Sequence, residues 1–372
     1  MPMTRRCALT LIGGGTVLAA AAGAGAFLAT RTPHAAIAPW NDAGGYADAR
    51  LNALSWALLA PNPHNRQPWQ AELIGDDALR LYRDSARDLP QTDPNGRQLT
   101  IGMGCFIELM IIAASASGHA IDLTLFPQGT GEGAPVAEAH FLPGQATTDP
   151  LFAHIPDRGT TREAYDDAAP DTAAIAALSP FARIITAPDQ VAALRQLTWD
   201  GWRTEALTPA AHGESVGLMR IGRREIEANP DGLAMGGPLM ESLALAGLLT
   251  REAQRDPESR GFQTGMEMFE RNLAATPAYA VITTPGNDPA THIDIGRRWM
   301  RFDLTATRLG LTTHPLLQVT QEYAEMAPLR AQAQAMLADE GETVQMISRL
   351  GRGPARAFQS PRWPLETIIL DA

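Results

Sequence analysis

The stretch from Gln98 to Ser117 constrains the fold more than any other part of the chain, because it reads as one long, largely apolar helix. Its core, IGMGCFIELMIIAA, presents no polar face to water, so this helix is expected to be buried inside the protein. Alternating or β-branched segments predict strands at WQAELI, ALRLY, AIDLTLF, VAEAHFL, ARIITA and AYAVITT. Helices and strands do not alternate as regular βαβ units, so the sequence predicts an α+β fold rather than a doubly wound sheet.

The remaining elements are predicted from the same patterns. Further helices are expected at Ala47 to Leu59, Ile293 to Leu309 and Glu322 to Leu337, and ETIIL is expected to close the chain as a strand. The long section between ARIITA and AYAVITT is mostly helical in pattern and rich in glycine and methionine.

Composition excludes several classes of function. Hydrophobic residues make up 45% of the 372 residues and charged ones 19%, which is typical of a globular protein. The net charge of −11 argues against a nucleic-acid partner. All 30 basic residues are arginine, so the chain has no lysine for a Schiff base or a P-loop. The eight histidines show no metal-ligand spacing, and Cys105 is expected to be a small buried side chain rather than a ligand, so we expect no metal.

The first 38 residues have the features of a targeting segment. Arg5 and Arg6 precede an uncharged stretch from Ala8 to Ala29, as in a twin-arginine export signal read by the twin-arginine translocase. We therefore expect a periplasmic protein, or one attached to the inner membrane by residues 8–29, and a plain membrane anchor is the alternative. The best small-residue cleavage site ends at Ala38 and is followed by Pro39, which leaves cleavage open.

Three polar segments carry the candidate chemistry. The first, PNPHNRQPW, collects prolines and hydrogen-bonding side chains in one stiff loop from Pro61 to Trp69. The second, DRGTTREAY, places Arg158, Thr160 and Arg162 at alternate positions, which in an extended segment puts two guanidinium groups and a hydroxyl on one side. The third, RLGRGPARAFQSPRWPLETII, adds arginines shortly before the last predicted strand: Arg352, Arg356 and Arg362. Taken alone, each of the two arginine-bearing segments is more simply interpreted as solvated charge.

Two other motifs match the sequence patterns of known functional sites but lack the secondary structure that those sites require. GESVG, from Gly213 to Gly217, matches the nucleophile elbow of hydrolases, but no strand is predicted before Ser215. GTGEGA, from Gly129 to Ala134, imitates a dinucleotide-binding loop, but a second strand follows it where a helix should begin. We interpret GTGEGA as a hairpin turn, and a Ser215 hydrolase remains a minor alternative.

Together the three polar segments resemble the nitroreductase superfamily of FMN proteins, and specifically its single-chain Acg-like branch. APNPHNRQPW resembles the loop that lies against the isoalloxazine ring in that family, and SPRWPLETII resembles its closing segment. DPNGRQLTIGMG and LGLTTHPLLQV are also similar to segments of the branch. The resemblance implies that FMN is bound by Pro63, His64, Asn65, Gln67, Arg158, Thr160, Arg162, Arg352 and Arg362.

The resemblance also implies how the chain is organised. Residues 39–150 would form a first nitroreductase-like half and residues 151–372 a second one, each with a sheet flanked by helices, as in a fused dimer. A helical insertion at about residues 200–275 would fold over the flavin as a lid. Because the first half has the ring-facing loop and the second half has the phosphate-binding arginines, we expect one flavin site, completed within a single chain.

Two functions follow from the resemblance. The first is an FMN-dependent oxidoreductase that takes hydride from NADH or NADPH and passes it, through flavin N5, to a small nitroaromatic or quinone-like acceptor. No protein side chain would then be the catalytic group, since the flavin carries the chemistry. The second is a protein that sequesters or stores FMN beneath its lid without turnover.

Overall fold

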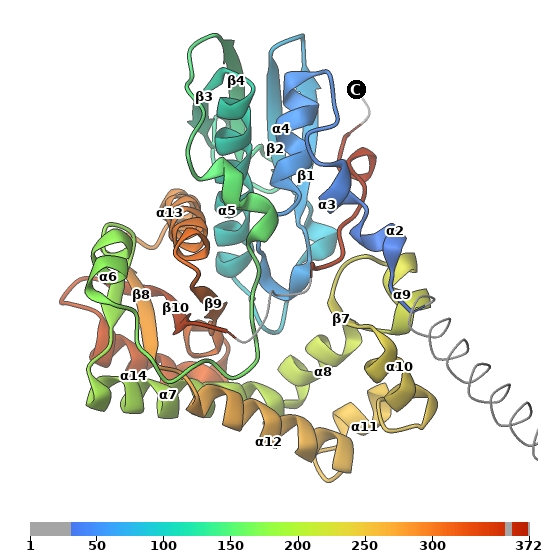
Figure 1. Cartoon of the computed structure of the whole chain (residues 1–372), viewed down its shortest axis with the longest axis vertical. Coiled ribbons are helices and arrows are strands. Elements are labelled where there is room, and N and C mark those ends of the chain that lie inside the picture. Colours follow the sequence, from blue (N-terminus) through green and yellow to red (C-terminus); the bar gives the residue numbers. More distant parts are fainter. Residues whose placement is uncertain (1–30, 354–358, 371–372) are drawn as a thin grey trace, which may run out of the picture.

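The computed structural model describes residues 31–353 and 359–370. The predicted export signal, with Arg5, Arg6 and the stretch from Ala8 to Ala29, lies outside the described residues, and so does Arg356. The α+β class is confirmed, with two four-stranded sheets, one two-stranded sheet and many helices among the described residues (Figure 1).

The first sheet contains β1 (Trp69–Ile74), β2 (Ala78–Arg83), β3 (His119–Leu125) and β4 (Ala137–Pro143). Its strand order is β1-β2-β4-β3, and every neighbouring pair is antiparallel. The long helix α5 (Arg97–Ala116) connects β2 to β3, within one residue of the predicted bounds at each end. The GTGEGA segment is a loop between the antiparallel strands β3 and β4, as predicted.

The second sheet repeats this arrangement with strands from later in the chain. It contains β5 (Arg183–Ile185), β8 (Ala278–Thr284), β9 (Thr312–Pro315) and β10 (Thr343–Gly351), in the order β5-β8-β10-β9. All its pairs are antiparallel, and helix α13 (Pro289–Arg308) connects β8 to β9 just as α5 connects β2 to β3. The two sheets therefore have the same strand order, with one long helix at the same point of each.

The other helices cover the sheets or form a separate arm. Short helices α2 (His34–Ile37) and α3 (Pro39–Asp42) lead into α4 (Ala49–Ala57), while α6 (Thr172–Leu178), α7 (Pro188–Leu207) and α14 (Ala327–Leu337) accompany the second sheet. The helix predicted from Glu322 begins instead at Ala327, after a 3₁₀ turn at Ala324–Met326.

An arm between α7 and β8 extends beneath the first half (Figure 1). It consists of α8 (Pro209–Gly217), α9 (Gly222–Ala228), α10 (Pro238–Leu245), α11 (Arg251–Arg255) and α12 (Arg260–Ala274), with the parallel pair β6 (Met219–Ile221) and β7 (Leu233–Met235). We call residues 209–274 the lid. Side-chain caps fix several helix starts in the chain, for example Thr250 before α11 and Ser259 before α12.

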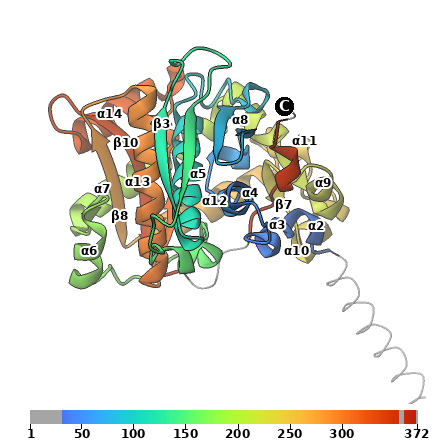
Figure 2. The same ribbon diagram turned by 90° about the horizontal axis from the view of Figure 1, so that it is seen from above.

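Helices α5 and α13 cross at the centre of the molecule, where they lie side by side (Figure 2). A Cβ placed on Gly104 of α5 would lie 2.2 Å from the carbonyl oxygen of Ile293, and one on Gly296 of α13 would lie 2.0 Å from that of Ile101. The two backbones are therefore in contact, which only glycine at both positions permits. One turn further on, the buried carboxylate of Glu108 accepts hydrogen bonds from Arg297 at 2.8 Å and Arg301 at 2.5 Å.

The buried environment of α5 also explains its composition. The helix is long and apolar enough to cross a membrane, yet 78% of its most apolar window is buried inside the protein. Within residues 31–353 and 359–370 it is the one helix that meets this length and composition, and its burial is typical of a core helix.

The C-terminal segment returns from the second sheet to the first. The N–H of Ala71 in β1 donates to the carbonyl of Ile368 at 2.8 Å, and the N–H of Leu370 donates to the carbonyl of Ala71 at 2.8 Å. The strand predicted at ETIIL was wrong in extent, because a 3₁₀ turn occupies Leu365–Thr367 and only an isolated bridge at Ile369 pairs with β1. The tail nevertheless ties the end of the chain to its first strand.

We expect Gly296→Ala to destabilise the protein by about 3 kcal/mol, because overpacking costs about this much and the added methyl would meet backbone rather than a movable side chain. Chemical denaturation of both proteins measures the difference. Gly265→Ala on α12 is the matched control, since nothing lies within 4 Å of its added Cβ, and there the higher helix propensity of alanine should stabilise by up to about 1 kcal/mol. A Gly296→Ala protein as stable as the wild type would contradict the close crossing.

Candidate functional site

The loop from Pro61 to Trp69 has an unusual backbone. His64, Asn65 and Gln67 have φ values of 48°, 51° and 51°, in the left-handed region that side chains other than glycine rarely adopt. The Asn62 side chain stabilises the loop by accepting from the Gln67 N–H at 2.7 Å. The loop packs on α5 at Gly102, where an added Cβ would lie 3.1 Å from Cβ of Asn62. Strain of this kind persists only where the surroundings impose it, and it often marks functional loops.

The two amides predicted to face a flavin ring bind protein groups in this structure. Gln67 is fully buried, donates from Nε2 to the Pro230 carbonyl at 2.8 Å and accepts from the Trp363 N–H at 3.0 Å. Asn65 donates to the Pro361 carbonyl at 3.0 Å and accepts from Arg362 at 2.7 Å. These amides therefore join the loop to the lid and to the C-terminal tail.

Arg362, predicted to contact the phosphate, instead binds protein groups inside the structure. Its guanidinium is buried and donates to the carbonyls of Leu58, Leu59 and Ala60, in addition to the Asn65 side chain. Burial, and then the nearby charge of Arg158, lowers the pKa of Arg362 to about 9. Its donors are committed to the backbone that precedes the loop.

The other predicted phosphate contacts differ from one another. Arg158 is buried, with Nη1 3.4 Å from Asp303 and Nη2 donating to the Leu59 carbonyl at 2.9 Å, while its Nε has no partner among the described residues. Thr160 lies beside Thr313 at an isolated bridge to β9. Arg352 is exposed and donates to the Gly310 carbonyl at 3.2 Å.

Arg162 is the predicted phosphate ligand whose guanidinium remains free. Within the described part of the chain, its side chain makes no hydrogen bond and no ion pair. It keeps exposed surface, yet the surrounding protein lowers its pKa by desolvation. The guanidinium is therefore accessible to a ligand, although neighbouring atoms displace part of its water.

The charge of Arg162 lowers the pKa of two histidines, which indicates where its side chain lies. Burial, as the largest cause, and the charges of Arg162 and Arg66 together lower the pKa of His64 to about 4. Burial and the charge of Arg162 likewise lower the pKa of His314 in β9. Arg162 from the second half therefore lies near the strained loop of the first half.

Asp231 fastens the lid to this loop. Its carboxylate lies 3.2 Å from Arg66 and 3.8 Å from Arg87, both in the first half, and 2.7 Å from Arg220 of the lid. The Gly232 N–H also donates to the Asn65 carbonyl at 3.3 Å. We call Asp231 with these three arginines the latch. NPDG in the sequence indicates a turn, but its pairing with arginines more than a hundred residues away carries no local signal.

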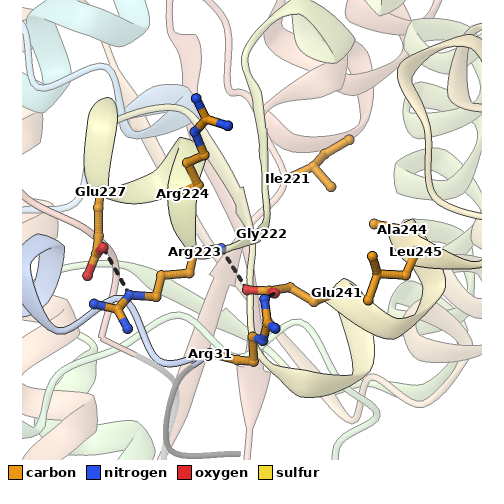
Figure 3. A pocket seen from close by; sticks show the side chains of 9 residues that line it. All are labelled: Arg31, Ile221, Gly222, Arg223, Arg224, Glu227, Glu241, Ala244 and Leu245. Carbon is orange, nitrogen blue, oxygen red and sulfur yellow. Dashed lines mark hydrogen bonds and ion pairs between the residues drawn. The ribbon is translucent and has the colours of Figure 1, made fainter. Parts of the chain in front are cut away.

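A cavity of about 490 Å³ lies elsewhere on the lid (Figure 3). Its walls include Arg224 and Leu245, and in the same wall Glu241 accepts from the Arg223 N–H at 2.8 Å. None of the predicted flavin-contacting residues lines it. The candidate site is thus the region between the loop, Arg162 and the lid, and not this cavity.

Two curated proteins are similar in sequence to most of the chain. No family model matches the chain. The Mycobacterium tuberculosis (strain H37Rv) protein named "Putative NAD(P)H nitroreductase Rv3131" is 25% identical over 343 residues, which cover 86% of this chain and 89% of that protein. "Uncharacterized protein Rv3127" of the same strain is 26% identical over 346 residues, covering 86% and 92%.

Solved structures give weaker likenesses. The FMN-dependent nitroreductase NfnB from Mycobacterium smegmatis, in complex with NADPH, has a TM-score of 0.37 at 14% identity and covers 59% of this chain and 96% of its own. A nitroreductase-named protein from Anabaena variabilis has a TM-score of 0.39 at 11% identity and covers 79% and 82%. At these TM-scores the likenesses carry no argument about this chain.

We expect Asp231→Asn to loosen the lid, because it leaves three arginines without their shared carboxylate. Amide hydrogen exchange over residues 229–235 should become about tenfold faster, equivalent to ~1.4 kcal/mol. Asp294→Asn is the control, since that side chain is 66% exposed and lies 3.9 Å from Arg297, and exposed pairs contribute little. Equal exchange in wild type and Asp231→Asn would show that the latch does not hold the lid.

Proposed function

We propose that the chain is an FMN-dependent oxidoreductase of the nitroreductase type, which passes hydride from NADH or NADPH to a small nitroaromatic or quinone-like acceptor. The observation that carries this proposal is the position of the Arg162 guanidinium, which has no partner among the described residues. It lies beside the strained loop of the other half, and the latch holds the lid against that loop. The relatives named above support it through sequence similarity over most of the chain.

The residues fit FMN best at its phosphate end. An exposed, partly desolvated guanidinium with no acidic partner among the described residues is suited to an anion, and a phosphate provides one. Thr160 and the unpartnered Nε of Arg158 lie in the same segment and would add donors. Three other predicted residues support the site indirectly, because their hydrogen bonds to backbone hold the loop in place: Arg362, Asn65 and Gln67.

Bound FMN would supply the two-electron chemistry, which no side chain of the chain can perform alone. The protein's own contribution is to orient and to exclude water. The latch closes the lid against the loop, and a closed, dry site strengthens every electrostatic contact inside it. His64, whose pKa burial lowers to about 4, adds a neutral ring beside Arg162.

A second function, sequestration of FMN without turnover, is favoured by the same latch. A lid fastened by Asp231 and by Gln67 would slow the exchange of a bound ligand. Anaerobic addition of NADPH to the FMN-loaded protein separates the two functions. For the oxidoreductase, flavin absorbance bleaches and returns when a quinone is added. An FMN-loaded protein that stays yellow with both NADH and NADPH would contradict the enzyme and support storage.

We expect Arg162→Ala to weaken FMN binding about thirtyfold, because it removes a charge-assisted contact worth roughly 2 kcal/mol. Fluorescence titration of the flavin-free full chain measures the dissociation constant. Arg203→Ala is the matched control, since Arg203 is exposed and makes no hydrogen bond or ion pair within the described residues. If both variants bind FMN as the wild type does, the phosphate lies elsewhere.

A further inference from the structure

A chain of buried polar side chains leads from the strained loop into the lid. Nε2 of His64 lies 3.0 Å from the hydroxyl of Ser215 on α8, and that hydroxyl lies 3.3 Å from Oε1 of Glu205 on α7. Oε2 of Glu205 accepts from Gln321 at 2.7 Å. Ser215 and Glu205 are both buried, so the chain crosses the protein interior.

This geometry excludes a hydrolytic triad. In a triad the acid binds the imidazole, and the imidazole activates the serine. Here the carboxyl group binds the serine, and Nδ1 of His64 is buried with no partner in the part of the chain that the structure describes. Ser215 also lies inside the helix α8, without the preceding strand that a nucleophile elbow requires. The hydrolase alternative from GESVG therefore has no support in the structure.

The surroundings favour the neutral form at both ends of the chain. Arg162 and Arg66 face His64, and with burial, the larger effect, they hold its pKa at about 4. Burial raises the pKa of Glu205, and the charge of Glu214 raises it further against hydrogen bonds from Gln321, Ser215 and Gln318. Tyr323 also lies close, since Glu205 contributes to the raised pKa of its hydroxyl. Burial therefore disfavours a second proton on His64 and favours a proton on the Glu205 carboxyl group.

The cluster is costly for stability, which argues against a purely structural role. Beside Nδ1 of His64, three more buried polar atoms here lack a protein partner: Oε1 of Gln318, Oε1 of Gln321 and the hydroxyl of Tyr323. Unsatisfied buried groups are rare and destabilise the folded protein. His64 also adopts the left-handed backbone conformation at φ 48°. Several destabilising features gathered beside one loop are typical of a functional site.

We propose that Glu205, Ser215 and His64 form a proton relay that protonates the acceptor as it is reduced, a role that rests on the proposed function. An acceptor that has gained a hydride carries a negative charge. The N–H bond at Nδ1 of His64 breaks and its proton neutralises that charge. The hydroxyl of Ser215, which donates to Oε1 of Glu205 in the structure, turns to donate to Nε2 of His64. Nε2 takes that proton, and Ser215 takes the carboxyl proton of Glu205. Each of the three groups passes on one proton, so the net result is one proton delivered to the acceptor. Glu205 is left as a carboxylate, which solvent reprotonates.

The first test uses the FMN-loaded protein after its flavin has been reduced with dithionite, so that NADPH is not needed. Stopped-flow mixing with a benzoquinone should show reoxidation about 100-fold slower in Ser215→Ala and in Glu205→Gln, the range of general-acid effects. Ser215→Thr keeps a hydroxyl and should restore most of the rate. Ser242→Ala, exposed on α10, is the control.

The pH profile separates a proton donor from a structural residue. As pH rises through the raised pKa of Glu205, its carboxyl loses the proton, so wild-type reoxidation should slow. Glu205→Gln keeps the size of the side chain and should be slow at every pH. Wild-type rates and pH profiles in Ser215→Ala and Glu205→Gln would overturn the relay.

A second readout needs no flavin. Nitrogen NMR of the FMN-free chain should show His64 neutral from pH 5 to 8, with its proton on Nδ1. A proton on Nε2, or a charged ring, would overturn the relay. A wild type whose reduced flavin a quinone does not reoxidise would instead overturn the proposed function, and the relay's role with it. Reoxidation of the wild type together with unaffected variants overturns the relay alone.

Discussion

The backbone contact between α5 and α13 is the interaction on which the rest of the structure depends. Gly104 and Gly296 bring the two helices so close that a methyl group at either would overlap a carbonyl oxygen of the other helix. Each helix connects two strands of its own sheet, and the sheets have the same strand order. The crossing thus fixes the two halves relative to each other, and with them the strained loop of one half and Arg162 of the other.

Arginine forms much of the internal scaffold around this crossing. Arg349 is fully buried in β10 and donates to Thr276 at 2.7 Å and to the carbonyls of Glu163 and Asn272 at 2.9 and 2.7 Å. Arg362 does the same for the backbone from Leu58 to Ala60. A planar guanidinium with five donors can satisfy several carbonyls at once, which an ammonium group does less well. This use suits a chain without lysine, and it contrasts with Arg162, whose side chain has no partner among the described residues.

The sequence predicted elements where burial is uniform. Helix α5 and strand β8 were placed within a residue, because both are apolar along nearly their whole length. Strands β9 and β10 were missed. β9 has four residues, and β10 buries Gln345, Ser348 and Arg349, which breaks the apolar pattern that signals a core strand.

The candidate site was only partly predictable for a similar reason. The loop and the arginines could be named from their residue types, but not their partners. Gln67 binds Pro230, and Asn65 binds Pro361, far along the chain. Arg158 pairs with Asp303 of α13 in the same way. Long-range pairing of this kind leaves no local pattern, and neither the latch nor the relay could be read from spacing. Which of the nine predicted residues touch a flavin stays a prediction.

The central claim is that the two halves build one flavin site within one chain. Titration of the flavin-free full chain with FMN, with its mass followed by light scattering, tests it most directly. The account predicts one FMN per chain, bound without any need for a second chain. Two flavins per chain, or binding only by a dimer, would contradict it.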